Sequence, residues 1–227
     1  MNPRRLADFR WADADGCSLV AVPVGSVEQH GPHLPLDTDT RIATAVAQSL
    51  SDAVLAPALE YGASGEHEGF PGTVSIGRET LTAVLVEHGR SMCRWASRVV
   101  FVNGHGGNAQ ALVDAVTLLR YEGRDVGWFA CAVQGADAHA GRTETSLLLH
   151  LCPDRVDIGC AAAGVTDPMS VLMPRLRSEG VRAVSPTGVL GDPRGADAAE
   201  GRLLLREMQD ALRHSVERWT PDEHGRL

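Results

Sequence analysis

The chain contains few aromatic residues and no hydrophobic run long enough to cross a bilayer. Phenylalanine, tryptophan and tyrosine together make up 4% of its 227 residues. Its longest apolar runs, such as 19–24 and 145–151, are far shorter than the ~20 residues that a transmembrane helix needs. The charged residues 1–8 are followed by Phe9-Arg10-Trp11, not by the apolar core of a secretory signal. We therefore expect a cytoplasmic protein without a membrane span.

The chain also has fewer positively than negatively charged residues. Lysine and arginine total 21 against 29 aspartates and glutamates, which gives a net charge of −8. Such a surface lacks the basic footprint that phosphate backbones and anionic membranes require, so we expect neither as a partner. Hydrophobic residues make up 44% of the sequence, enough for one closed core, and no long charge run interrupts it. The sequence predicts a single domain over residues 1–227.

The cysteines form no recognisable framework. Their number is odd, they are scattered, and no Cys-x-x-Cys pair occurs among them. They are Cys17, Cys93, Cys131, Cys152 and Cys160. We expect them to be reduced, buried and to pack as small apolar side chains.

Short valine-rich runs alternate along the chain with segments of helical periodicity. Strands are predicted over 19–24, 53–59, 98–103 and 125–133, and helices over 39–50, 78–96, 108–121, 143–151, 168–178 and 195–219. Asp37 and Thr38 could cap the first of these helices, and Asp197 the last. This alternation predicts an α/β protein with three α/β/α layers, a mostly parallel central sheet, and functional loops at the carboxyl ends of its strands.

The loop after the first predicted strand carries Glu28, His30 and, at its far end, Asp39. Because side chains alternate along an extended segment, Glu28 and His30 project to the same side. Asp39 opens the next helix, where a carboxylate is favoured by the helix dipole and could turn back towards them. Together they offer the oxygen and nitrogen ligands that bind Zn, Mn or Fe(II). A polar loop with a helix cap is an equally good interpretation of this stretch alone, because Glu-x-His is a weak motif.

Two further loops bring more candidate ligands. Asn103-Gly-His-Gly-Gly-Asn108 places His105 directly after a valine-rich strand, between glycines that allow close approach. It does not fit a dinucleotide-binding loop, because it is not G-x-G-x-x-G and no acidic residue ends the next strand. After the last predicted strand come His139 and Glu144. Each alone would more often be a surface residue, but their arrival at successive strand ends predicts one site.

The remaining histidines receive no function. His67, beside Glu66 and Glu68, could line the rim of a pocket, but a solvated loop residue is the favoured interpretation. His88, His150 and His214 are interpreted as residues on helix faces. His224 lies in the C-terminal tail.

These loops resemble the creatininase family of metal-dependent amidohydrolases. The resemblance implies a two-metal centre in which Glu28 and His105 hold one ion, His30 holds the other, and Asp39 bridges them. The ions would be Fe2+, Zn2+ or Mn2+, and the ligand set does not choose among them. The segments that carry the resemblance are 25–39, 70–73, 103–108 and 139–146.

The sequence departs from creatininase at two places. Creatininase has a glutamate two residues after the histidine of the second motif, where this chain has Gly107. We expect Glu144 to replace that ligand and to count, with His139, among the catalytic residues. The tryptophan that creatininase carries before the residue matching His139 is absent from 134–138, which makes creatinine a poor substrate. The implied chemistry is attack of metal-activated water on an amide, while His139 protonates the departing amine.

Segments 35–43 and 187–198 resemble the peptide-cleaving branch of the family. This implies a modified precursor peptide as substrate, cut near its carboxyl end to release a small core for a redox cofactor. It also implies a ring-like homo-oligomer, a hexamer or an octamer. One alternative is an amidohydrolase acting on a small formamide or cyclic amide. Another is a metal-stabilised assembly or chaperone subunit without turnover. It is less favoured because structural zinc sites prefer cysteine and none of the five cysteines is near these motifs.

Overall fold

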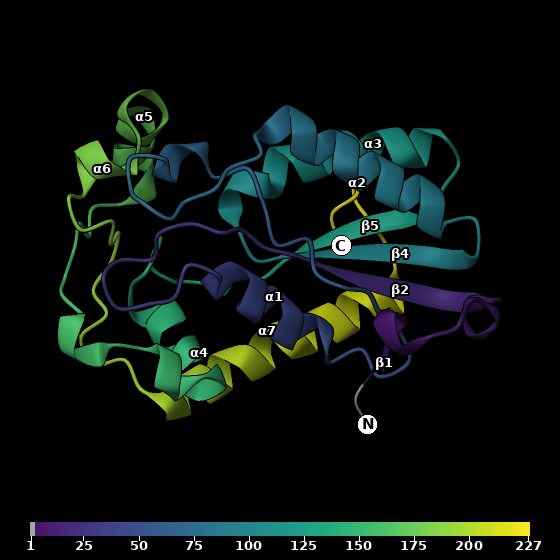
Figure 1. Ribbon diagram of the computed structural model, residues 1–227, viewed down its shortest axis with the longest axis horizontal. Helices are drawn as coiled ribbons and strands as arrows, with labels where there is room; N and C mark the ends of the chain where they lie inside the picture. Colours follow the sequence, from purple (N-terminus) through teal and green to yellow (C-terminus); the bar gives the residue numbers. More distant parts are fainter. Residues whose placement is uncertain (1–2) are drawn as a thin grey trace.

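The computed structural model describes residues 3–227, and its centre is a five-stranded sheet whose strands all run parallel (Figure 1). In spatial order the strands are β1 (Arg4–Arg5), β3 (Val54–Leu55), β2 (Cys17–Val24), β4 (Ala96–Asn103) and β5 (Val126–Ala130). The apolar runs of β2 and β4 pair along their length, with Val20 opposite Val99 and Val22 opposite Phe101. These side chains are fully buried, as expected for a parallel sheet covered on both faces.

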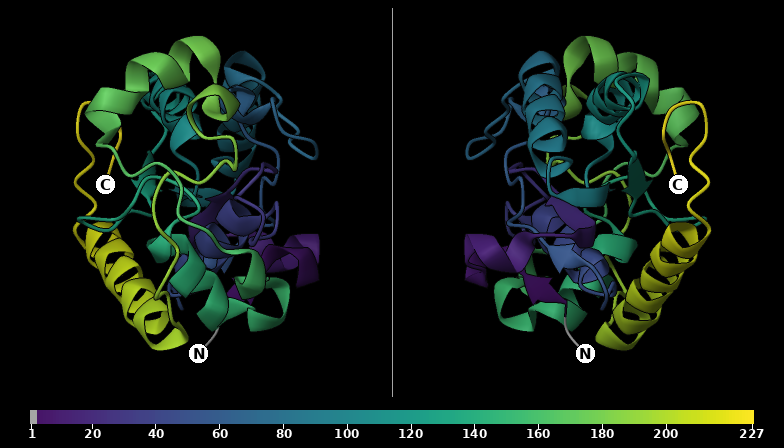
Figure 2. Two further views of the ribbon diagram at one scale, coloured as in Figure 1. Left: turned by 90° about the vertical axis from the view of Figure 1, so that its left-hand side faces the viewer. Right: turned by 90° about the vertical axis from the view of Figure 1, so that its right-hand side faces the viewer.

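Helices cover both faces of the sheet, which confirms the predicted three-layer α/β/α fold (Figures 1 and 2). On one face lie α1 (Thr38–Ala47), α4 (Arg142–Leu151) and α7 (Ala198–Arg218), and on the other α2 (Arg78–Met92) and α3 (Ala109–Tyr121). Two short helices, α5 (Met169–Glu179) and α6 (Val181–Val184), lie at the left in Figure 1, on the side where the strands end. One-turn 3-10 helices occur at Leu6–Asp8, Trp11–Ala14, Gly65–His67, Gly106–Asn108, Pro153–Arg155 and Ile158–Cys160.

The apolar interior is divided by the sheet into two clusters. The cluster on the α1, α4 and α7 side is centred on residues such as Leu147 and Leu212, and the one on the α2 and α3 side on Phe101 and Leu112. A third, smaller cluster joins α5 to α6 through buried side chains that include Leu176. Helices α5 and α6 therefore pack around an apolar cluster separate from the two at the sheet.

Several predicted boundaries are corrected. The strand expected over 53–59 is only two residues long, because Pro57 has no N–H to donate to a ladder, and the chain rejoins β2 through a single bridge at Leu59. Asp37 precedes α1 but makes no side-chain cap and instead accepts a bond from Arg41 Nε at 2.7 Å. Asp197 does cap α7, as predicted, by accepting bonds from two backbone amides.

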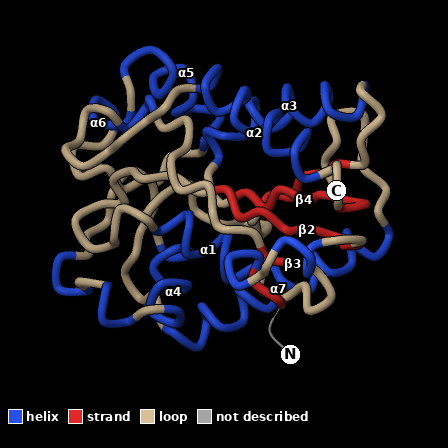
Figure 3. Tube along the Cα trace, turned by 45° about the vertical axis from the view of Figure 1, so that its right-hand side comes forward, coloured by secondary structure: helices blue, strands red, loops and turns tan. Residues whose placement is uncertain are grey.

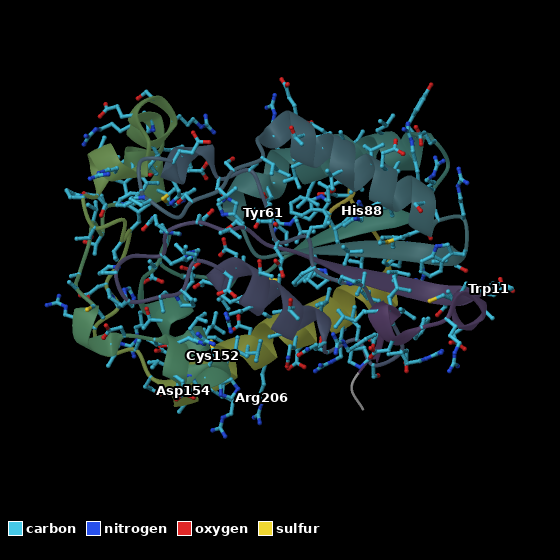
Figure 4. The ribbon with its side chains drawn as sticks, viewed as in Figure 1. Trp11, Tyr61, His88, Cys152, Asp154 and Arg206 are labelled. Atoms are coloured by element: carbon cyan, nitrogen blue, oxygen red, sulfur yellow. The ribbon has the colours of Figure 1, made fainter. Side chains whose placement is uncertain are left out.

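All five cysteines are free, but the expectation that they are buried is wrong. Cys160 is exposed and the other four are half-buried. Cys152, for example, lies where α4 ends (Figure 4). They lie near the ends of strands and helices, where packing is incomplete.

Among residues 3–227, no helix combines the length and the apolar character that crossing a bilayer demands. The first two residues of the segment in which we expected no secretory signal lie outside the described residues, and the cytoplasmic location stays a prediction.

A close contact between α4 and α7 yields a test of the fold. A Cβ at Gly201 would overlap the backbone carbonyl of Ser146, which cannot move away without shifting α4. Gly201→Ala should lower the free energy of unfolding by about 1–3 kcal/mol, although alanine favours helix more than glycine does. Urea unfolding measures this change.

The matched control is Gly89→Ala in α2, where the added Cβ would meet the side chain of Leu119 and no backbone atom. We expect a smaller loss there. A Gly201→Ala protein as stable as the wild type would contradict the described packing.

Candidate metal centre

The loops that follow β2, β4 and β5 gather on one side of the molecule (Figure 3). They bring all six predicted site residues together. Ligand atoms of Glu28, Asp39 and His105 lie within 4.8 Å of one another, and so do those of a second group. The second group is His30, His139 and Glu144, and a third is Glu28, His67 and His139. The structure thus brings together the three loops that the sequence analysis singled out.

Asp39 belongs to the first group and also contacts His30 of the second. Its Oδ1 is 3.1 Å from His30 Nε2, and its Oδ2 is 3.3 Å from His105 Nδ1. The Ser26 hydroxyl donates to Oδ2 at 2.6 Å and fixes the carboxylate plane. One carboxylate thus faces both imidazoles, as a bridging ligand would.

Two glycines allow Asp39 to reach this position. A Cβ at Gly25 would overlap Thr40, and one at Gly104 would overlap the backbone carbonyl of Asp39 itself. Only residues without a side chain let α1 begin directly against the ends of β2 and β4.

Two buried asparagines hold the loops in register. Asn108 Nδ2 donates to Gly25 O at 2.9 Å, and its Oδ1 accepts from Ala63 N at 2.8 Å. Asn103 Nδ2 donates to His105 O at 2.7 Å. These bonds tie the segment after β2, the 60–77 connection and the turn after β4 to one another.

Glu28 is the most unusual group of the centre. Its side chain is fully buried, and neither carboxylate oxygen has a hydrogen-bond partner among residues 3–227. Oε2 is 3.2 Å from His105 Nε2, while Oε1 is 3.3 Å from His67 Nε2 and 3.8 Å from His139 Nδ1. Burial raises the pKa of Glu28. A buried carboxylate without donors is costly, and a cation would offset that cost.

Protons are bound tightly by the neighbouring imidazoles. Burial alone lowers the pKa of His30, but the Asp39 carboxylate outweighs it and brings the pKa to about 10. The pKa of His105 also reaches about 10, since Glu28 and Asp39 outweigh its burial. Burial opposes ionisation of Asp39, yet His30 holds its pKa well below the usual range. Without a metal, protons supply the positive charge that these carboxylates need.

The other ring nitrogen of each histidine is bonded to the backbone. His30 Nδ1 lies 3.2 Å from Glu28 O, and His105 Nε2 lies 3.3 Å from Ala63 O. In the neutral ring this leaves the opposite nitrogen, which faces Asp39, free to bind a metal. Carboxylate oxygens, oriented imidazole nitrogens and the unpartnered Glu28 together fit divalent cations such as Zn, Mn or Fe(II).

The sequence interpretation of His67 is wrong. This residue is buried in the centre, with its Nε2 facing Glu28, and Glu66 beside it lies 3.6 Å from His105 Nε2. Both belong to the long 60–77 connection. A connection of this length is usually functional or disordered. The bonds that fold it inwards come from distant residues such as Asn108, which local sequence does not reveal.

Glu66 also occupies the space beside Gly107, the position at which creatininase has a glutamate. A Cβ at Gly107 would lie 2.7 Å from Glu66 Oε1 and 2.5 Å from Ala63 O, and would overlap His105 Nε2. A side chain at position 107 is therefore excluded by the inward fold of the 60–77 connection.

Glu144 is held at the start of α4. Its Oε2 accepts a bond from Ala140 N at 2.6 Å and lies 3.9 Å from His30 Nε2. Ala140 itself has a φ of 52°, a left-handed conformation that alanine rarely adopts. Burial raises the pKa of Glu144 to about 7. Such backbone strain beside His139 is typical of functional sites.

A cavity of about 1030 Å³ opens above the centre. Asp39, His105, His139 and Glu144 line it on the side of the sheet, while apolar side chains of α5 line it opposite. Cys131 also lines this cavity, so the expectation that no cysteine is near the motifs is wrong for that residue. No cysteine, however, belongs to the candidate metal-binding groups found among residues 3–227.

The sequence profile of the creatininase family, described as creatinine amidohydrolase, matches residues 6–216. The chain belongs to the creatininase family. This confirms the resemblance inferred from its loops. Members of this family hydrolyse C–N bonds.

Its relatives and structural neighbours agree with this assignment. A mycofactocin precursor peptide peptidase of Mycolicibacterium smegmatis is 60% identical, over 92% of this chain and 88% of that protein. Creatinine amidohydrolase of Pseudomonas putida is 31% identical, over 88% of this chain and 90% of that protein. A solved structure described as creatininase with Mn has a TM-score of 0.81 and 27% identity, and covers 96% of this chain and 100% of that one.

The crowding at Gly107 yields a test of the centre. Gly107→Ala should displace His105 and so lower the affinity for zinc or manganese. We expect a loss of about tenfold, the lower end of the range for mutation of groups that orient metal ligands. Less metal should then remain bound per chain. Gly106→Ala is the matched control, because nothing lies within 4 Å of its Cβ. Elemental analysis after dialysis measures both. Equal metal content in the two variants would show that this contact does not position His105.

Proposed function

We propose that this chain is a metal-dependent peptidase that removes the C-terminal part, a core dipeptide, from the modified mycofactocin precursor peptide. The observation that carries the proposal is the buried cluster of carboxylates and imidazoles at the floor of a cavity of about 1030 Å³. The relative of 60% identity, named for this activity, supports the choice of substrate.

The ligand assignment is part of the proposal. Glu28 and His105 would hold one divalent ion, His30 would hold the other, and Asp39 would bridge them. Glu144 would supply the ligand that Gly107 cannot. The positions of Asp39 between the two imidazoles and of Glu144 near His30 support it. When bound, such ions lower the pKa of the attacking water and polarise the scissile carbonyl.

His139 would provide the proton for the departing amine. Its Nε2 lies 2.8 Å from Gln29 O, a bond that only an N–H can donate. Its Nδ1 is then the nitrogen that faces the centre, 3.8 Å from Glu28 Oε1. At this atom the ring can take up a proton and deliver it to a leaving group in the cavity.

The size of the cavity favours a peptide over the alternative, a small formamide or cyclic amide. Pockets for drug-sized ligands measure about 300–1,000 Å³, and a small amide would fill only a fraction of this cavity. The apolar residues Met169, Met173 and Leu176 on α5 would contact side chains of a longer substrate.

Direct incubation tests the choice of substrate. Protein loaded in turn with Fe2+, Zn2+ or Mn2+ should release the small core from the modified precursor peptide, with products identified by mass spectrometry. Small formamides and cyclic amides should remain unchanged in parallel reactions. Turnover of the small amides alone would support the alternative function. Native mass spectrometry of the same samples would test the predicted hexamer or octamer.

The ligand assignment is tested by removing ligands. Glu28→Ala and His105→Ala should each lose bound metal, because each removes a donor and leaves a buried partner unpaired. Elemental analysis of the purified variants measures the loss. Full metal content in both variants would refute the assignment.

The role of His139 separates catalysis from metal binding. His139→Ala should keep the wild-type metal content, yet lose roughly 10²–10⁴ in kcat, the range for removal of a general acid. His88→Ala is the control, since His88 lies on α2 (Figure 4) and bonds only Val84 of its own helix. Should His139→Ala be purified without metal, His139 is a ligand and not the proton donor.

A further inference from the structure

One buried amide, that of Gln29, contacts two histidines of the centre at once. Gln29 is 5% exposed, and its Nε2 lies 2.9 Å from His67 Nδ1 and 3.0 Å from His139 Nε2. The same atom lies 3.2 Å from Gly188 O. An amide nitrogen carries only two hydrogens, so it cannot donate to all three neighbours.

The orientation of this amide is fixed by its other end. Gly31 N donates to Gln29 Oε1 at 2.9 Å, so the atom there must be the carbonyl oxygen. Nε2, with its two hydrogens, is therefore the atom that faces the histidines. Gly188 holds it closely, since a Cβ at that position would overlap Gln29 Oε1.

His139 cannot accept either hydrogen. Its Nε2 already lies 2.8 Å from Gln29 O, an oxygen that can only accept, so this ring nitrogen carries a hydrogen. The two hydrogens of the Gln29 amide must then go to Gly188 O and His67 Nδ1. Because His67 Nδ1 accepts, the ring is neutral and its hydrogen is on Nε2.

The two histidines thus present opposite atoms to Glu28. His67 offers an N–H at 3.3 Å from Oε1, and His139 offers a bare Nδ1 at 3.8 Å from the same oxygen. The His67 N–H is not aligned for a hydrogen bond to Glu28. His67 also lines the cavity, together with His139 and Glu66.

We propose that Gln29 is a positioning residue that sets these two tautomers, and that His67 is a hydrogen-bond donor to the carbonyl oxygen of the substrate, not a metal ligand. The second half rests on the proposed hydrolysis. An imidazole whose Nε2 carries hydrogen cannot bind a metal through that atom, but it stabilises negative charge that develops on an oxygen in the cavity.

The tautomers can be read without any substrate. In zinc-loaded protein with ¹⁵N-labelled histidine, two-bond ¹H–¹⁵N correlation spectra should show His67 as the neutral Nε2–H form and His139 with hydrogen on Nε2. His67→Gln identifies the His67 signals by their absence and should retain full zinc content. A wild-type spectrum with hydrogen on His67 Nδ1, or loss of zinc in His67→Gln, would overturn the proposal.

Gln29→Glu tests the positioning role. A carboxylate keeps the size of the amide but can only accept, so His67 should shift to the Nδ1–H form. The kcat for the peptide should fall by about 100-fold, as for loss of one oxyanion donor, with zinc content unchanged. Gln48→Glu, exposed where α1 ends and outside the lining of the cavity, is the control and should change neither. Unaltered His67 signals in Gln29→Glu would refute the role of Gln29.

These outcomes are separable from failure of the proposed function. If the predicted tautomers are found but the peptide is not cleaved, the substrate assignment is wrong and the role of Gln29 stands. If the peptide is cleaved but the tautomers differ, the roles of Gln29 and His67 fail and the proposed function stands.

Discussion

Burial of the Glu28 carboxylate, with no hydrogen-bond donor aligned to either oxygen, is the constraint on which the rest of the site depends. An ionised carboxylate in the interior needs positive charge. Of the three imidazoles within 3.8 Å of it, His67 and His139 are inferred to be neutral, which leaves His105 or a bound cation to supply that charge. Asp39 repeats the pattern with His30 and His105. Without a cation, the cluster therefore lowers the free energy of unfolding, and its geometry is suited to bind one.

The fold supports this cluster by bringing loops together, not by long elements alone. Gly25 and Gly104 let α1 begin against the strand ends, and Asn108 joins the segment after β2 to the 60–77 connection. The Gln29 side chain contacts both His67 of the 60–77 connection and His139 of the loop before α4. Each contact is between residues distant in sequence, so the centre and the tertiary fold form together.

The sequence predicted the layers, and it placed six candidate residues at one edge of the sheet, because both depend on local patterns. Valine-rich runs indicate buried parallel strands, and polar residues directly after them must meet at one edge of the sheet. His67 and Glu66 could not be assigned, since bonds to residues distant in sequence, such as that from Ala63 N to Asn108 Oδ1, turn their connection inwards. Burial of the cysteines was overestimated for a related reason, because hydrophobicity does not specify how tightly element ends pack. The shortness of β3, by contrast, could have been read from Pro57.

Thermal unfolding of the wild type and Glu28→Gln, each with and without excess Mn2+, tests the central claim most directly. The amide removes the buried charge, so metal-free Glu28→Gln should unfold at a temperature equal to or above that of the metal-free wild type. Mn2+ should raise the unfolding temperature of the wild type, by the linkage expected for a ligand of the native state, and leave that of the variant almost unchanged. A metal-free variant that is clearly less stable, yet gains as much from Mn2+ as the wild type, would contradict the account.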